Sequence, residues 1–422
     1  MSLFFDRLKN YAGLSDDDVA LVARCLDELS PQWAHFTDVT QANQIKVLEA
    51  FQKNQVADFH LNGSTGYGYG DTGRDVLERV WADIFCAEKA LVRSNLVSGT
   101  HAIATVLFGI LRPGDEAVSI SGLPYDTLQT VIGKSDDAQG TLREFGIHHK
   151  SVPLKDNDFD EAAIRAVVTP QTKMVMIQRS RGYEWRDSLS IKKIARACEI
   201  VKSISPEIVI FVDNCYGEFV EDREPLEVGA DIIAGSLIKN PGGGLAPRGG
   251  YIAGREDLVN ASAQRLTAPG ISDDVSSSLD FNRPAFQGLF MAPLIVEQAL
   301  KGASFAAAYL GAKGYVVSPT ADAQRTDIIQ CVAFGDPDKL RKFCQGIQAA
   351  SALESYVTPY DDQLPGYDDP VIMAGGTFIQ GSSIELSIDG PMRAPFIGYM
   401  QGGLSISHII ASVCLAAKKM EG

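Results

Sequence analysis

The segments "EIVIFVDNCYGEF" (residues 207–219) and "DIIAGSLIKN" (residues 231–240) decide the fold, because each joins a short apolar run to a polar end. A continuous apolar run of this length is typical of a strand that is buried on both faces of a parallel sheet. Asp213 follows the first run, and Ser236 and Lys239 follow the second. Since ligands bind beyond the carboxyl ends of parallel strands, the two segments predict a ligand site there.

Short β-rich runs alternate with amphipathic helical patterns from about residue 75 onward. The predicted strands are residues 90–93, 116–119, 149–152, 174–178, 208–212 and 232–234, and "GGYIAG" (residues 249–254) is a further strand that closes the sheet. The predicted helices between them are residues 75–85, 100–111, 159–167 and 191–203. This alternation predicts an α/β fold, with a mostly parallel sheet covered by helices on both faces.

The chain divides into three predicted regions. Residues 1–60 carry apolar positions at helical spacing and predict an N-terminal helical segment. Residues 61–292 form the large α/β domain. Residues 293–422 begin with a long helical pattern at 293–310 and continue as a smaller C-terminal α+β domain. The predicted elements of that domain are strands at residues 327–333, 371–374 and 383–387 and helices at residues 337–350 and 405–418.

The composition of the 422-residue chain is that of an ordinary globular protein, with 45% hydrophobic and 22% charged residues. The formal net charge of -15 argues against a nucleic-acid or anionic-membrane partner, because both polyanions would be repelled. The cysteines form no C-x-x-C pair and the histidines no H-E-x-x-H motif, so no metal site is indicated. No signal peptide or membrane-spanning run is visible, which predicts a cytoplasmic protein.

Asp213 and Lys239 together predict a pyridoxal phosphate site. Taken alone, Asp213 is also typical of a turn cap and Lys239 of a surface lysine. A lysine forms an imine with the cofactor aldehyde, and a carboxylate keeps the pyridine nitrogen protonated. An apolar, partly dry site would keep the lysine amine available as a base.

A phosphate site is predicted at the start of the helix that follows Ser98. Ser98, Gly99 and Thr100 open this apolar helix, where free backbone N–H groups and the helix dipole favour an anion. The alternative is simple capping of the helix by Ser98. Ser236 could donate to the same phosphate, and Tyr125 could stack on the pyridine ring or be an ordinary half-buried tyrosine.

The order of these residues resembles the fold-type I pyridoxal phosphate enzymes over about residues 60–400. The segment "YGYGDTGRDVLERVWADIFCAEKALVRSNLVSGTHA" (residues 67–102) is similar to the cysteine and methionine metabolism branch, which includes the cystathionine and methionine lyases. "DNCYGEF" (residues 213–219) and "SLIKNPGGG" (residues 236–244) resemble the bacterial methionine gamma-lyase-like, or aluminium-resistance, proteins.

The resemblance implies a role for each candidate residue. It implies that Lys239 is the Schiff-base lysine, Asp213 the pyridine partner and Tyr125 the stacking residue. The implied phosphate ligands are Ser98, Gly99, Thr100 and Ser236, joined by Tyr67 and Arg74 from a neighbouring subunit of a homodimer or homotetramer. The spacing of Tyr67 and Arg74 departs from the usual Tyr-x-Arg.

The substrate carboxylate would be held by a late arginine, Arg393, because a guanidinium fork fits a carboxylate. An ordinary surface arginine is an equal alternative for that residue. The chain also departs from the lyases at "IQRSRGYEWR" (residues 177–186), where they carry an acidic Pro-Asn-Pro stretch, so Arg181 is a second candidate for substrate or cofactor.

The implied activity is carbon–sulfur lyase chemistry, by β- or γ-elimination, on an amino acid such as methionine or cystathionine. Aminotransfer and transsulfuration use the same core residues and stay open as alternatives. Ser236 and Lys239 also form the Ser-x-x-Lys motif of penicillin-binding proteins, but the downstream Lys-Thr-Gly is missing. A phosphate- or nucleotide-binding regulator that uses "NPGGG" (residues 240–244) would leave Asp213 and Tyr125 without a role.

Overall fold

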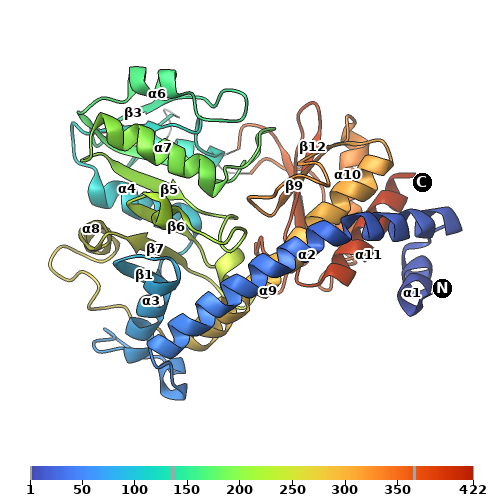
Figure 1. The fold of residues 1–422 in the computed structure, drawn as a ribbon, viewed down its shortest axis with the longest axis horizontal. Coiled ribbons are helices and arrows are strands. Elements are labelled where there is room, and N and C mark those ends of the chain that lie inside the picture. Colours follow the sequence, from blue (N-terminus) through green and yellow to red (C-terminus); the bar gives the residue numbers. More distant parts are fainter. Residues whose placement is uncertain (1, 135–137, 365–366, 422) are drawn as a thin grey trace.

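Two sheet domains are joined by two long helices. The computed structural model describes residues 2–134, 138–364 and 367–421. Helices α2 (Asp16–Lys53) and α9 (Asn282–Ala312) pack together and run from the larger domain to the smaller one (Figure 1). The Trp33 indole N–H donates to the Ser304 hydroxyl at 2.9 Å and ties the two helices together. Within the described residues, no helix is long and apolar enough to cross a bilayer.

The larger domain holds a seven-stranded sheet in the order β1-β7-β6-β5-β4-β2-β3. Its strands are β1 (Lys89–Arg93), β2 (Glu116–Ser119), β3 (His148–Ser151), β4 (Thr172–Gln178), β5 (Val209–Asp213), β6 (Ile232–Ser236) and β7 (Gly250–Gly254). Strands β3, β2, β4, β5 and β6 are paired in parallel. Strand β7 lies antiparallel between β6 and β1, so it is an inner strand and does not close the sheet at an edge.

Helices cover both faces of this sheet, which confirms the predicted α/β class. Phe211 packs with the helices on one face, whereas Ile210 and Val212 point to the other, as the period of two along a strand requires. The helices of the first face are α4 (Gly99–Ile110), α5 (Asp126–Ile132) and α8 (Glu256–Leu266). Those of the second face are α3 (Thr72–Ile84), α6 (Glu161–Val167) and α7 (Ile191–Ile204).

The smaller domain holds an antiparallel sheet in the order β10-β11-β12-β9-β8. Its strands are β8 (Val316–Ser318), β9 (Ile329–Ala333), β10 (Val371–Ala374), β11 (Ser387–Pro391) and β12 (Ile397–Gln401). Helices α10 (Pro337–Ala349) and α11 (Ile406–Glu421) pack on one face of it, and α1 (Leu3–Ala12) joins the same core. The opposite face contacts Tyr183 and Tyr216 of the larger domain.

Several predicted elements of the C-terminal half are wrong in their bounds. Helix α9 begins at Asn282 and runs through Pro293, because buried residues continue at helical spacing on both sides of that proline. Residues 383–386 form bends, and β11 starts only at Ser387. The Ser383 N–H donates to the Ile238 carbonyl of the larger domain at 3.1 Å, so this backbone is not available to a sheet.

Candidate active site

A cavity of about 770 Å³ lies where the carboxyl ends of β4, β5 and β6 meet the smaller domain. Its walls include the starts of α4 and α5 and the inner face of β10, β11 and β12. Most of the predicted site residues line this one cavity: Ser98, Gly99, Thr100, Tyr125, Arg181, Asp213, Ser236, Lys239 and Arg393. The structure therefore brings together residues that are up to about 300 positions apart in the chain, as expected for strand ends on one edge of a sheet.

Lys239 lines the cavity just beyond the end of β6. Its Nζ lies 4.0 Å from the centre of the Tyr216 ring. The backbone beside it is fixed from the smaller domain, because the carbonyl of Ile238 accepts hydrogen bonds from the Ser382 hydroxyl and the Ser383 N–H, each at 3.1 Å. The backbone that precedes the lysine is thus fixed between the two domains.

The surroundings of Lys239 are more polar than the sequence predicts. Burial alone lowers the pKa of its ammonium group, but Cys215, Tyr216, Asp213 and Tyr125 oppose this effect and hold the pKa above its ordinary value. Asp213 is the carboxylic acid of this set, and its negative charge, when it is ionised, favours the protonated lysine. In the protein without cofactor, these groups therefore favour the protonated form of Lys239.

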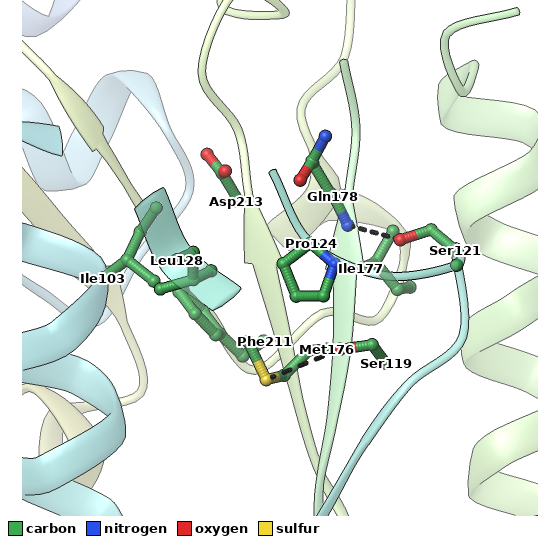
Figure 2. A pocket seen from close by; sticks show the side chains of 11 residues that line it. Ile103, Ser119, Ser121, Pro124, Leu128, Met176, Ile177, Gln178, Phe211 and Asp213 are labelled. Carbon is green, nitrogen blue, oxygen red and sulfur yellow. Dashed lines mark hydrogen bonds between the residues drawn. The ribbon is translucent and has the colours of Figure 1, made fainter. Parts of the chain in front are cut away.

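Asp213 lies at the end of β5, opposite Gln178 at the end of β4. Figure 2 shows both side chains on the same side, beyond the apolar part of the two strands. One oxygen of Asp213 accepts the N–H of Cys215 at 3.1 Å. Burial raises the pKa of the Asp213 carboxyl, and the charge of Lys239 and the hydrogen bond to Cys215 oppose the rise. A buried carboxylate in this position can hold a protonated ring nitrogen.

The start of α4 forms the opposite end of the site. The Ser98 hydroxyl caps the helix by accepting the His101 N–H at 3.1 Å, so the capping alternative is also realised. A Cβ on Gly99 would lie 3.2 Å from Cβ of Ser236 and 3.4 Å from Sγ of Cys215, so glycine lets the helix start approach β5 and β6 closely. An anion-binding helix start, a lysine and a strand-end carboxylate in one cavity fit pyridoxal phosphate.

Tyr125 lies between these two ends. Its hydroxyl shares a 2.8 Å hydrogen bond with the Thr100 hydroxyl, and its N–H donates to Oε1 of Gln178 at 2.8 Å. Burial and the nearby Asp213 raise the pKa of the phenol far above its ordinary value. The phenol therefore keeps its proton at neutral pH.

The two arginines predicted for the substrate carboxylate differ in their freedom to bind one. Nη1 of Arg181 is held by the Ser318 carbonyl at 3.1 Å, its hydroxyl at 3.0 Å and Cys331 Sγ at 3.4 Å. Its Nε and Nη2 are buried and have no hydrogen-bond partner among the described residues. Arg393 is half-exposed and already forms an ion pair with Asp369 at 3.1 Å. Of the two arginines, Arg181 is therefore the one with two N–H groups, on Nε and Nη2, that have no partner among the described residues.

A family model described as methionine gamma-lyase matches residues 19–421 of the chain. The chain belongs to the methionine gamma-lyase family. A solved protein from Listeria monocytogenes, assigned provisionally as a cystathionine beta-lyase involved in aluminum resistance, is 53% identical, with 95% of this chain and 99% of that one covered and a TM-score of 0.93. A protein from Clostridium acetobutylicum with the same provisional assignment is 46% identical, with 99% of both chains covered and a TM-score of 0.96.

The fold of this methionine gamma-lyase family member extends to more distant proteins. A pyridoxal-5'-phosphate-dependent protein from Escherichia coli is only 17% identical, yet 90% of this chain and 95% of that one superpose with a TM-score of 0.60. The predicted fold-type I class, the predicted pyridoxal 5'-phosphate cofactor and the predicted carbon–sulfur lyase class are confirmed by the family and its fold.

Two predicted site residues lie outside the cavity. Tyr67 is 74% exposed, with its ring 5.6 Å from that of Tyr69. The side chain of Arg74, in the first turn of α3, is buried, pairs with Asp75 at 2.8 Å and donates to the carbonyls of Gly68 and Ser276. In this single chain neither residue approaches Lys239, and their predicted role at a neighbouring subunit's phosphate stays a prediction.

Other lining residues escaped the sequence analysis of this family member. Tyr216 follows Asp213 in the quoted segment, and its φ of 70° is unusual for a bulky residue. Gln178 is the last residue of a predicted strand, and this position at a strand end could have indicated that it lines the site. Asp389 and Tyr367 come from the smaller domain and also line the cavity. No pattern in the sequence indicates that they reach the strand ends of the larger domain.

Proposed function

We propose that this carbon–sulfur lyase acts on a sulfur-containing amino acid of the cystathionine or methionine type, with Lys239 as the residue that binds the cofactor covalently. The observation that carries the proposal is the shared cavity, in which Lys239 lies beside Tyr216 and faces the strand-end carboxylate of Asp213. The provisional assignment of the Listeria and Clostridium proteins as cystathionine beta-lyases supports cystathionine as the first substrate to test.

Pyridoxal phosphate, when bound, withdraws electrons from Cα of the amino acid and so makes the Cα proton acidic. Asp213 would hold the ring nitrogen protonated, which sustains that withdrawal. The N–H groups at the start of α4, together with the Ser236 hydroxyl, would hold the phosphate. Tyr125 would cover one face of the ring.

Lys239 has a second task in the reaction. Its amine removes the proton from Cα, and Lys239 lines the cavity from a backbone that the smaller domain fixes at Ile238. The proton that the departing sulfur needs would come from the phenol of Tyr125, which keeps its proton at neutral pH. Thiolate is a good leaving group because thiols are much more acidic than alcohols.

Arg181 is the residue that would hold the α-carboxylate of the substrate. The Nε and Nη2 donors form the edge of a guanidinium that fits a carboxylate through two parallel hydrogen bonds. Both are without a partner among the described residues, whereas the third nitrogen is anchored to Ser318 and Cys331. Arg393 would then act at the mouth of the cavity, where Asp369 holds it.

The elimination balances without an oxidant. Cleavage of the Cβ–S bond of L-cystathionine releases homocysteine, and addition of water to the remaining fragment gives pyruvate and ammonia. Cleavage of the Cγ–S bond of L-methionine gives methanethiol, and addition of water to the remaining fragment gives 2-oxobutanoate and ammonia. Aminotransfer would instead give a keto acid without free thiol.

The test is a panel of sulfur amino acids, with thiol, keto acid and ammonia measured together. Release of all three in equal amounts is expected from at least one member. Borohydride reduction of the holoenzyme should attach the pyridoxyl group to the peptide that contains Lys239, and Lys239→Ala should abolish the label and turnover. A label on Lys134 or Lys173 would remove Lys239 from its role, and keto acid without thiol would favour the aminotransferase.

The same proposal includes a cytoplasmic homodimer or homotetramer with shared active sites. Tyr67 and Tyr69 form an exposed aromatic pair, and Arg74 buttresses the loop that carries them. Exposed aromatic side chains are enriched at subunit interfaces. Light scattering should give a mass of at least two chains, and Tyr67→Ala should weaken both assembly and cofactor retention. A fully active monomer would contradict this arrangement.

A further inference from the structure

A carboxylate from the smaller domain faces the active-site cavity. Asp389 lies on β11, where alternate residues point to opposite faces. Ile388 is fully buried in the core of the smaller domain, and Asp389, two positions after Ser387, lines the cavity instead. Its neighbours across the sheet are Met373 on β10 and Tyr399 on β12.

The contacts of Asp389 leave its charge without a bound cation. Oδ2 accepts from Nε2 of Gln401 at 3.3 Å, and the Tyr183 hydroxyl is a second hydrogen-bond partner. Gln401 also donates to the Ser387 hydroxyl at 3.3 Å. Among the described residues, Lys239 is the cation whose charge acts on Asp389. In the proposed function, however, the amine of Lys239 binds the cofactor and removes the proton from Cα.

From this geometry we propose that Asp389 selects substrates whose side chain ends in a protonated amine. The amine would form an ion pair with Asp389 across the cavity from the sheet end that carries Lys239. L-cystathionine has such a group in its homocysteine half, whereas L-methionine ends in a methyl group. This inference rests on the proposed function and names the substrate class within it.

The physical reason for this selection is that a substrate which fills the cavity removes water from the Asp389 carboxylate. A charge that loses its water without gaining a partner is strongly unfavourable. A substrate with a distal ammonium restores a partner, and one that ends in a methyl group does not. A site built to bind a polar group therefore discriminates against the analogue that lacks it.

A matched pair of substrates isolates the effect. S-(2-aminoethyl)-L-cysteine and S-ethyl-L-cysteine present the same Cβ–S bond and almost the same length, but only the first carries a distal ammonium. For the wild-type holoenzyme we expect kcat/KM to be at least about 10-fold higher for the aminoethyl compound, given that such selectivity reflects an unpaired buried group. Asp389→Asn should bring the two values within about threefold, mainly by raising KM for the aminoethyl compound.

Glu184→Gln is the matched control. Glu184 lies at the rim of the same cavity and pairs with Arg186 at 2.9 Å, so its loss removes a negative charge without touching Asp389. The control should keep the wild-type preference. If Asp389→Asn lowers kcat/KM equally for both substrates, Asp389 acts on Lys239 or in the chemistry. If the preference for the aminoethyl compound is unchanged, Asp389 contacts no ammonium. Either result overturns the inference.

A binding measurement keeps the inference separate from the lyase reaction. L-Lysine and L-norleucine have the same chain length and no leaving group at Cβ or Cγ, and calorimetric titration of the holoenzyme gives their dissociation constants. The wild type should bind L-lysine at least about 10-fold more tightly than L-norleucine, and Asp389→Asn should bind the two equally. If no sulfur compound releases thiol, the proposed lyase substrate class fails; if thiol is released but lysine has no advantage, the role of Asp389 fails.

Discussion

The Nζ of Lys239 lies 4.0 Å from the centre of the Tyr216 ring, within the range of a cation–π contact. The two residues follow different strand ends, and Tyr216 has a left-handed backbone with φ of 70°. The Tyr216 hydroxyl donates to the Ser383 hydroxyl of the smaller domain at 3.3 Å. One side chain thus supports the reactive lysine and connects the two domains.

Substitution of Tyr216 separates these two roles. Tyr216→Phe keeps the ring and loses only the hydrogen bond to Ser383, so kcat should fall less than about fivefold, as for one modest hydrogen bond. Tyr216→Leu removes the ring and with it about 0.5–2 kcal/mol of cation–π attraction, and should reduce kcat about 3- to 30-fold. Steady-state kinetics at saturating cofactor measures both. Equal kinetics of the two variants would show that the ring does not act on Lys239.

Asp213→Asn should leave the fold intact but impair the chemistry. The amide cannot hold a protonated ring nitrogen, so electron withdrawal from Cα weakens and kcat should fall about 100-fold or more, a loss on the scale of removing one charge-stabilising group. The variant should keep its circular dichroism spectrum and most of its cofactor, measured by absorbance. The control is Asp126→Asn, which removes another carboxylate that lines the same cavity. A kcat near the wild-type value would reduce Asp213 to a capping residue.

Arg181 and Arg393 can be separated by their effects on KM. Arg181→Lys replaces a two-donor edge with a single point charge, so KM should rise at least about 10-fold while the cofactor absorbance stays unchanged. Arg393→Met removes the partner of Asp369 and should change KM less than about threefold, as for an exposed ion pair. The reverse result would assign the substrate carboxylate to Arg393. Thermal unfolding of Arg181→Lys shows whether the buried site still folds.

The strand ends of the larger domain could be predicted from the sequence because physics limits the choices there. Continuous apolar runs such as residues 208–212 can only be buried strands or short core helices, and their polar ends must then gather at one edge. The three-residue strand β8 and the glycine-containing β12 gave no such signal. Helix α9 was longer than predicted because tertiary packing carries it through Pro293, against the local preference of proline.

The cavity side that faces the smaller domain could not be predicted in the same way. Asp389 and Met373 line the cavity from the smaller domain, and no local pattern in the sequence records how the two sheets are placed relative to each other. Arg181 was a candidate from its place in the sequence, but its free donor edge follows from anchors on Ser318 and Cys331, more than 130 positions away. These contacts depend on packing between residues that are far apart in the chain, and the periodicity of a single sequence does not contain that information.

The last prediction concerns pH. Burial raises the pKa of Asp389 to about 6, against hydrogen bonds from Tyr183 and Gln401 and the charge of Lys239. The carboxyl group is therefore charged above about pH 6 and neutral below it, and only the charged form pairs with an ammonium. The distal amine of S-(2-aminoethyl)-L-cysteine stays protonated across this range, since an alkyl amine titrates near pH 10.

The ratio of kcat/KM for S-(2-aminoethyl)-L-cysteine and S-ethyl-L-cysteine should thus be constant from about pH 7 to 8 and fall as the pH drops through 6. One unit below the pKa, about a tenth of the carboxyl groups remain charged, so the ratio should fall roughly tenfold at most by pH 5. Effects of pH on the α-amino group, Lys239 and the cofactor are common to both substrates and cancel. In Asp389→Asn the ratio should not depend on pH, and a wild-type ratio that is equally flat would show that the ionisation of Asp389 does not govern the choice of substrate.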